Sequence, residues 1–153
     1  MKSTYIDAIL LIERLHRRFL DVIKTELDRH HISDINNVQT LILYNISGEQ
    51  LTIGELTNRG YYLGSNVSYN VKKLVQNAYL IQEPSPHDKR STRVRLSDKG
   101  LELCRRIDEL YERHVGTLQE MTGDEGLAQL ASTNESLQQL ERFWADYINT
   151  IYK

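Results

Sequence analysis

Apolar residues recur at helical spacing through most of the chain and change to strand spacing in one short stretch. From residue 64 to residue 78 apolar side chains return every three or four positions, which predicts a helix with one buried face. From Thr92 to Leu96 apolar and cationic residues alternate, which predicts a half-buried strand. The positions expected to point inward are Val67, Val71, Leu74 and Val75 in the helix, and Thr92, Val94 and Leu96 in the strand. The pattern therefore predicts a mainly α-helical fold with a small antiparallel β-hairpin.

A shorter helix is predicted immediately before the helix of residues 64–78. Thr52 and Glu55 have the Thr-x-x-Glu spacing of a capping box, which satisfies two free amide donors at a helix start. Gly60 is expected to end this helix. The two helices and the turn between them form a helix-turn-helix pattern.

The strand at residues 92–96 requires a partner, and residues 79–81 (Tyr-Leu-Ile) are expected to supply it. Between the strands, residues 84–90 (Pro-Ser-Pro-His-Asp-Lys-Arg) favour a loop, and the ladder is not expected to continue past the prolines. Lys89 and Arg90 stand at the tip of the hairpin. Such a tip can contact phosphates or the minor groove of DNA.

Longer helices are predicted on both sides of this central part. They are expected at Tyr5–Arg29, Asn37–Ile46, Asp98–Met121 and from Thr122 towards the chain end. Ser33 or Asn36 can cap the second of them, and Ser97 is a good cap for the third. Thr122 and Glu125 repeat the capping-box spacing and open the last helix.

The first and last helices carry more apolar surface than one small core can cover. The stripe of the first helix is Ile9, Ile12, His16, Phe19, Ile23 and Leu27, widened by Ile6, Leu10, Leu15 and Val22. The stripe of the third helix is Leu101, Cys104, Ile107, Tyr111, Val115, Leu118 and Met121. The stripe of the last helix is Leu127, Leu130, Asn134, Leu137, Leu140, Trp144, Ile148 and Ile151. Pairing of the terminal helices in a two-fold dimer would cover this surface, with Trp144 as the expected anchor.

Length and composition are those of an ordinary globular protein. A chain of 153 residues is expected to form a single domain. No apolar run approaches the ~20 residues of a membrane helix, and the charges near the start exclude a signal peptide. One cysteine excludes an internal disulfide and any multi-cysteine metal site. We therefore expect a cytoplasmic protein.

The net charge of −2 conceals an uneven distribution. Between Ser65 and Lys99 seven cations oppose three anions, a net charge of +4, so the rest of the chain carries −6. A local basic surface is enough to attract a polyanion such as DNA. The candidate DNA contacts on the predicted helix of residues 64–78 are Ser65, Asn66, Ser68, Tyr69, Lys72 and Lys73. Those on the hairpin are Lys89, Arg90 and Arg93. Asp88 is expected to orient Arg90 rather than to touch DNA.

These motifs resemble the MarR family of winged helix-turn-helix regulators. The order helix, helix, hairpin carries Asp88-Lys-Arg90 before a strand that ends in Leu96-Ser-Asp-Lys-Gly100, which is similar to the family's Asp-x-Arg wing tip and Leu-Thr-x-x-Gly motif. Glu55-Leu56 and Val67-Ser68 also fall on matching positions. The bulkier turn Gly60-Tyr-Tyr-Leu63 departs from the usual Leu-Gly-Leu-Ser. The stretch RGYYLGSNVSYNVKKL also resembles the LdtR-type subgroup, which is linked to genes for cell-wall cross-linking.

The resemblance implies that different parts of the chain bind DNA and form the dimer. A DNA-binding lobe is expected at residues 32–100, and a helical dimerisation region at residues 1–31 and 101–153. The homodimer would bind double-stranded DNA with an inverted-repeat operator. Small phenolic or lipophilic effectors of the family bind between the lobe and the dimer helices. The residues bordering that crevice would be His16, Phe19, Tyr44, Tyr61 and Tyr62, although the same aromatic residues could simply fill the core.

Other functions find less support in the residues. No Gly-rich phosphate loop is present, because Gly60-x-x-x-Gly64 lacks the Lys-Ser/Thr that would contact phosphate, and an enzyme is not expected. Adjacent His30 and His31 point about 100° apart on a helix, so no metal site or cofactor is expected. Cys104 is a core residue or, less favoured, a redox sensor. The runner-up is a winged-helix protein–protein module that does not bind DNA.

Two roles are possible for one residue of the predicted helix at residues 64–78. Asn70 lies beside the buried stripe, where the family more often has an apolar residue. It can form a hydrogen bond within the lobe, which we favour, or turn outward to touch DNA.

Overall fold

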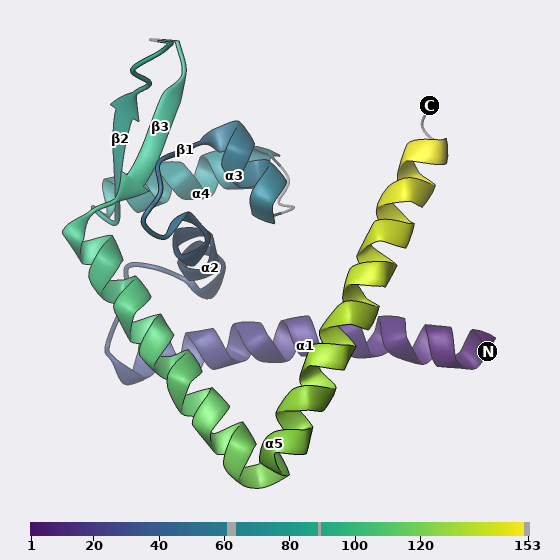
Figure 1. Ribbon diagram of the computed structural model, residues 1–153. Helices are drawn as coiled ribbons and strands as arrows, with labels where there is room; N and C mark the ends of the chain where they lie inside the picture. Colours follow the sequence, from purple (N-terminus) through teal and green to yellow (C-terminus); the bar gives the residue numbers. More distant parts are fainter. Residues whose placement is uncertain (61–63, 89, 152–153) are drawn as a thin grey trace. The chain divides into compact units, whose positions relative to one another are not determined.

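The computed structural model describes residues 1–60, 64–88 and 90–151, and it gives the predicted mainly helical fold with a small antiparallel sheet (Figure 1). Residues 1–108 and 109–153 form two compact units. No helix in the part of the chain that the structure describes is both long and apolar enough to span a membrane.

The first unit begins with α1 (Lys2–Arg29) and α2 (Asn37–Ile46), close to the predicted bounds. Of the two predicted caps for α2, the structure uses Asn36. Its Oδ1 accepts from the backbone N–H of Gln39 at 2.8 Å, and the Asn36 N–H donates to Gln39 Oε1 at 3.1 Å. This reciprocal capping box fixes the start of α2 and the direction of the Gln39 amide.

The helix-turn-helix consists of α3 (Ile53–Gly60) and α4 (Gly64–Gln76), and both agree with the prediction. The backbone N–H of Glu55 donates to Thr52 Oγ1 at 3.1 Å, which is one half of the predicted capping box. Val67, Val71 and Leu74 are at most 2% exposed and hold α4 in the core. The predicted inward face of α4 is confirmed at these three positions.

The sheet has three strands in the order β1 (Leu51–Thr52), β3 (Thr92–Leu96), β2 (Leu80–Pro84). β1, which pairs with Val94 and Arg93, was not predicted because two residues show no periodicity. β2 was predicted too short. Pro84 pairs with Thr92, and the Ser85 N–H donates to Ser91 O at 2.9 Å. A proline is tolerated there because β2 is an edge strand, whose outer donors need no partner.

The core of the first unit gathers residues from every one of these helices and strands. Its largest fully buried side chains are Ile23, Ile42, Leu43, Ile46, Leu56, Leu74, Ile107, Val67, Val94 and Thr40. The predicted stripe at the start of α5 (Asp98–Ile151) is partly wrong. Leu101 is 48% exposed, whereas Leu103, Ile107 and Leu110 are buried. Both sets have helical spacing, so periodicity alone could not choose between the two faces.

A polar cluster joins the wing to the loop before α2. Asp34 accepts from the Tyr79 hydroxyl and from Lys99 Nζ, each at 2.6 Å, and Lys99 Nζ also lies 4.3 Å from the centre of the Tyr79 ring. Partial burial alone would raise the pKa of Asp34, but the hydrogen bonds from Lys99 and Tyr79 outweigh it and lower that pKa. The cluster therefore favours an ionised Asp34 that holds the start of β2 and the start of α5 together.

Ser97 caps α5, as predicted. Its Oγ accepts from the Gly100 N–H at 3.1 Å and donates to the backbone oxygen of Ala78 at 2.6 Å. The Ser97 N–H donates to Tyr79 O at 3.0 Å. A Cβ on Gly100 would lie inside van der Waals contact with the Tyr79 carbonyl, so only glycine fits where α5 passes β2.

The second unit is the continuation of α5. The predicted break near residue 122 appears as one non-helical residue, Gly123, with φ 70° and ψ −174°, a conformation that glycine adopts far more readily than other residues. The Thr122 hydroxyl donates to Leu118 O at 2.7 Å, back into the preceding turn. Thr122 therefore does not form the predicted capping bond, because its hydroxyl is used in the preceding turn and the break falls one residue later, at Gly123.

Candidate nucleic-acid interface

The outer face of α4 is polar and open to solvent. Asn66, Ser68 and Lys72 are exposed, and Tyr69 is 61% exposed although it is large and aromatic. These residues lie opposite Val67, Val71 and Leu74 because the apolar stripe fixes which face of the helix turns inward. Ser65 also belongs to α4, but its side chain lies outside the part of the structure that is described.

Lys73 differs from Lys72 in its surroundings. Its side chain is half-buried, and Nζ lies 5.8 Å from the centre of the Tyr69 ring. This cation–π distance couples the two side chains on adjacent turns of α4. Lys72 is exposed and lines a groove between α4 and β2, so the two lysines do not occupy equivalent positions.

The wing tip is organised by Asp88. Its Oδ1 accepts from the backbone N–H of Arg90 at 2.9 Å, its Oδ2 from the Ser91 hydroxyl at 3.2 Å, and its backbone oxygen from the Ser91 N–H at 3.0 Å. These bonds close the turn and leave Arg90 exposed. Asp88 thus acts on the backbone of the turn that carries Arg90, and Lys89 lies outside the described residues.

Two of the cations that were counted toward a basic surface are engaged within the lobe. Arg95 forms a salt bridge with Glu83 across the hairpin at 3.0 Å, and Lys99 is bound to Asp34. Arg93 is half-buried between Thr52 and Glu83 of the neighbouring strands, and its Nε is buried without a hydrogen-bond partner. Between Ser65 and Lys99, the described cations that remain for DNA are Lys72, Lys73, Arg90 and the end of the Arg93 side chain.

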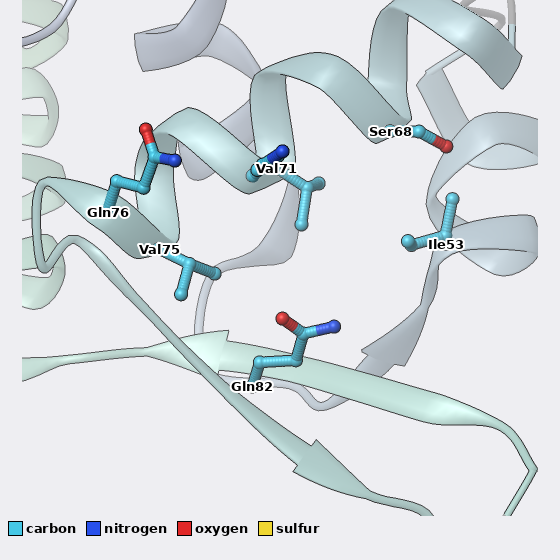
Figure 2. A pocket seen from close by; sticks show the side chains of 7 residues that line it. Ile53, Ser68, Val71, Val75, Gln76 and Gln82 are labelled. Atoms are coloured by element: carbon cyan, nitrogen blue, oxygen red, sulfur yellow. The ribbon is translucent and has the colours of Figure 1, made fainter.

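A groove of about 420 Å³ separates α4 from the wing. Figure 2 shows Val71 and Val75 pointing from α4 toward Gln82 of β2, with Ile53 across the groove from them, near Ser68. Ser68, Lys72 and Gln76 complete the lining, so the groove has an apolar floor and a polar rim. Two candidate DNA contacts, Ser68 and Lys72, therefore stand at the edge of this groove.

Of the five residues predicted for an effector site, the structure describes three, which lie on α1 and α2. His16 is exposed, and Phe19 and Tyr44 are half-buried. The Tyr44 hydroxyl donates to Asp108 Oδ1 at 2.5 Å. Tyr61 and Tyr62 lie outside the described residues, and the groove beside α4 includes none of the five.

Cys104 has the surroundings of a structural cysteine. Burial raises the pKa of its thiol to about 11, and the nearby Asp108 adds to this effect. A redox sensor needs a lowered thiol pKa, because the thiolate is the reactive form. The favoured reading of Cys104 as a core residue fits these surroundings.

Asn70 forms its hydrogen bonds within the lobe, which confirms the favoured alternative. Its Oδ1 accepts from Gln39 Nε2 at 3.1 Å, and its Nδ2 donates to Asn66 O at 2.8 Å. Gln39 was not singled out from the sequence. The Asn36-x-x-Gln39 spacing is a readable capping signal, but its link to α4 spans 31 residues and leaves no local pattern.

The comparisons with known proteins agree with this geometry. Residues 35–100 match the winged helix DNA-binding domain family. Over 146 residues the chain is 36% identical to the exopolysaccharide II synthesis transcriptional activator ExpG of Rhizobium meliloti (strain 1021), and the match covers 94% of this chain and 73% of that protein.

Solved structures share the fold. Streptococcus pneumoniae FabT in complex with DNA has a TM-score of 0.75 and 17% identity, and the match covers 93% of this chain and 98% of FabT. The reduced form of MarR from E. coli has a TM-score of 0.69 and 20% identity, covering 83% of this chain and 93% of MarR. At these identities the likeness concerns the winged-helix fold.

Proposed function

The chain belongs to the MarR-type winged-helix DNA-binding transcriptional regulators, and on this basis we propose how it binds DNA. α4 is the reading helix and enters the major groove, while the wing tip contacts the minor groove or the backbone beside it. Residues 32–100 form the DNA-binding lobe. The protein is a regulator and not an enzyme.

The observation that carries this proposal is the composition of the exposed face of α4. Asn66, Ser68 and Tyr69 offer hydrogen-bond groups and an aromatic ring, and Lys72 offers a charge one turn later. Base edges are recognised by such short polar side chains, and phosphates by lysine. Arg90 adds a second basic contact from the wing.

We further propose a homodimer formed by residues 1–31 and 101–153. Large apolar side chains on α1 and α5 are at least 40% exposed in the single chain: Tyr5, Ile6, Leu10, Leu11, Leu15, Leu101, Val115, Leu118, Met121, Leu130, Leu137, Phe143, Tyr147, Ile148 and Ile151. Exposed apolar surface of this extent is characteristic of an interface. A two-fold dimer would cover it and would present two reading helices to an inverted-repeat operator.

Regulation by a small lipophilic or phenolic effector is part of the proposal. His16, Phe19, Tyr44, Tyr61 and Tyr62 are its candidate contacts. The effector would act by binding more tightly to the form of the dimer that does not fit the operator, because only differential affinity shifts an equilibrium. A DNA-binding regulator of this kind works in the cytoplasm. The narrower resemblance to the LdtR-type subgroup stays a prediction.

A gel-shift assay with mixed genomic fragments tests DNA binding directly. At two stated salt concentrations, we expect retarded complexes whose affinity falls steeply as salt rises. A protein–protein module, the alternative raised by the sequence, would leave all fragments unshifted at both concentrations.

Replacing Arg90 by alanine is expected to weaken binding to operator and non-operator DNA alike. The wing tip contributes a phosphate contact, so its loss should reduce the slope of log affinity against log salt by about one unit. Fluorescence anisotropy at several salt concentrations measures this slope. Arg142→Ala, an exposed arginine of the second unit, is the matched control and should leave the slope unchanged. An unaltered slope for Arg90→Ala would remove the wing from the DNA interface.

Replacing Asn66 by alanine is expected to relax base preference at one or two positions of each half-site. Asparagine forms a bidentate pair with adenine, and such a pair discriminates by ~1–3 kcal/mol. Competition between operator variants that differ at single bases measures the effect. A role as helix cap predicts lower thermal stability instead, but Asn66 lies two residues inside α4. Equal loss of affinity for every sequence would show that Asn66 does not read bases.

A further inference from the structure

We propose that Gln39 is a positioning residue for base recognition, which acts on the reading helix through Asn70. The inference rests on the proposed function, because it concerns how α4 is held while it reads DNA. It assigns a role in specificity to a residue of α2 that does not touch DNA.

The Gln39 side chain is held at both ends. The residue is 8% exposed, its Oε1 accepts from the Asn36 N–H at 3.1 Å, and its Nε2 donates to Asn70 Oδ1 at 3.1 Å. Because the capping box occupies the oxygen, the NH₂ end is the one that faces α4. The start of α2 therefore sets the direction of the amide that reaches the reading helix.

The side-chain amide of Asn70 extends the hydrogen bonds of Gln39 into α4. Its Oδ1 is occupied by Gln39, so its Nδ2 is the group that donates to Asn66 O, at 2.8 Å, one turn earlier in α4. Asn66 is a candidate base contact, and Tyr69 precedes Asn70 directly. The hydrogen bonds thus run without interruption from the cap of α2 to the residue that we expect to read DNA.

These hydrogen bonds fix the orientation of α4 more closely than its apolar contacts can do alone. Val67, Val71 and Leu74 bury one face of the helix, but hydrophobic contact has no direction and tolerates small rotations and shifts. A hydrogen bond weakens steeply when its geometry is lost. The bond between Gln39 and Asn70 therefore fixes the rotation and the axial position of α4, on which the alignment of Asn66 with a base depends.

Gln39 and Asn70 supply a complementary donor and acceptor. An apolar side chain at position 70 would leave the Gln39 NH₂ group buried without this acceptor, at the cost of its desolvation. Asn70→Leu should therefore free α4 to shift. Asn70→Asp keeps the acceptor for Gln39 and loses only the Nδ2 donor to Asn66 O, a bond within α4 that does not hold this helix against α2. The pair of variants separates the link to α2 from other properties of the position.

Selection from a randomised duplex library, about two turns of DNA long, tests the inference with wild-type protein, Asn70→Leu, Asn70→Asp and Thr40→Val. Wild type should enrich one motif. Asn70→Leu should lose discrimination among single-base variants of that motif by at least about fivefold, the lower range for one base contact, while affinity for unrelated DNA stays the same. Asn70→Asp should bind all DNA more weakly because of its charge but keep the discrimination.

Thr40→Val is the matched control for stability. It removes the hydrogen bond from Thr40 Oγ1 to Asn36 O, 2.8 Å long, within the same helix α2, and it changes neither partner of the bond between Gln39 and Asn70. It should retain the motif even if its melting temperature falls as far as that of Asn70→Leu. If Asn70→Leu does not fold, Asn70→Ala carries the same prediction.

The outcomes separate the two claims. No enrichment by wild-type protein would overturn the proposed function and this inference with it. Enrichment of one motif with equal discrimination by wild type and Asn70→Leu would overturn the inference alone. Loss of discrimination in Asn70→Asp or in Thr40→Val would also overturn it, because the effect would then not depend on the bond to Gln39.

Discussion

Replacing Ile148 by aspartate is expected to convert the proposed dimer to monomers and to lower operator affinity by about 10²–10⁴-fold. Ile148 is 54% exposed in the single chain and stands among Phe143, Tyr147 and Ile151, which are all more than half exposed. Burial of such a side chain contributes about 1.5–3 kcal/mol, and a two-fold interface loses it twice. The affinity falls because two linked half-sites gain roughly this factor from effective concentration.

Size-exclusion chromatography with light scattering measures the mass, and anisotropy measures the affinity. Asn149→Asp is the matched control, since it adds the same charge one residue later, about 100° around α5. This variant should remain a dimer with wild-type affinity. Trp144, the anchor expected from the sequence, is half-buried in the single chain and is a less direct probe of the exposed surface. Dimers of undiminished stability in Ile148→Asp would place the interface elsewhere.

Replacing Gly100 by alanine is expected to lower the free energy of unfolding by about 1–3 kcal/mol, the usual cost of overpacking. The added Cβ would collide with the Tyr79 carbonyl, which is backbone and cannot turn away. Tyr79 O also accepts from the Ser97 N–H at 3.0 Å, so the start of α5 must separate from the start of β2. We therefore expect weaker DNA binding as well, because β2 carries the wing.

Gly116→Ala is the matched control for Gly100→Ala on the same helix. A Cβ on Gly116 meets nothing within 4 Å, so alanine should stabilise the helix there by about 0.5–1 kcal/mol. Thermal unfolding followed by circular dichroism compares the two variants, which should shift the melting temperature in opposite directions. A melting temperature of Gly100→Ala at or above that of wild type would mean that the helix start and β2 are not closely joined.

The helices and the buried face of α4 could be predicted from the sequence because burial repeats with the helical period. The inward positions Val67, Val71 and Leu74 follow from spacing alone, and the cap at Ser97 from one side chain at a helix start. The strand β1 could not be predicted, since two residues contain no period and their pairing with β3 is a long-range contact. The buried face at the start of α5 also depends on tertiary contacts, because two sets of residues fit the helical period.

The partners of the charged and polar side chains could not be predicted from the sequence for a similar reason. Arg95 and Lys99 add to the positive charge of the lobe, yet their partners Glu83 and Asp34 are distant in sequence. The same is true of Gln39 and Asn70, whose bond joins two helices. Spacing along a chain records which face of a helix is buried, whereas polar pairs between elements depend on how those elements meet.

Binding-site selection from genomic fragments tests whether the protein binds DNA as a dimer with two reading helices. The wild-type protein is incubated with fragmented genomic DNA, bound fragments are recovered, and the common sequence is determined. A dimer with two reading helices predicts an inverted repeat whose half-sites are centred about one helical turn, ~34–36 Å, apart. Recovery of unrelated fragments, or of one half-site without its inverted copy, would contradict the account.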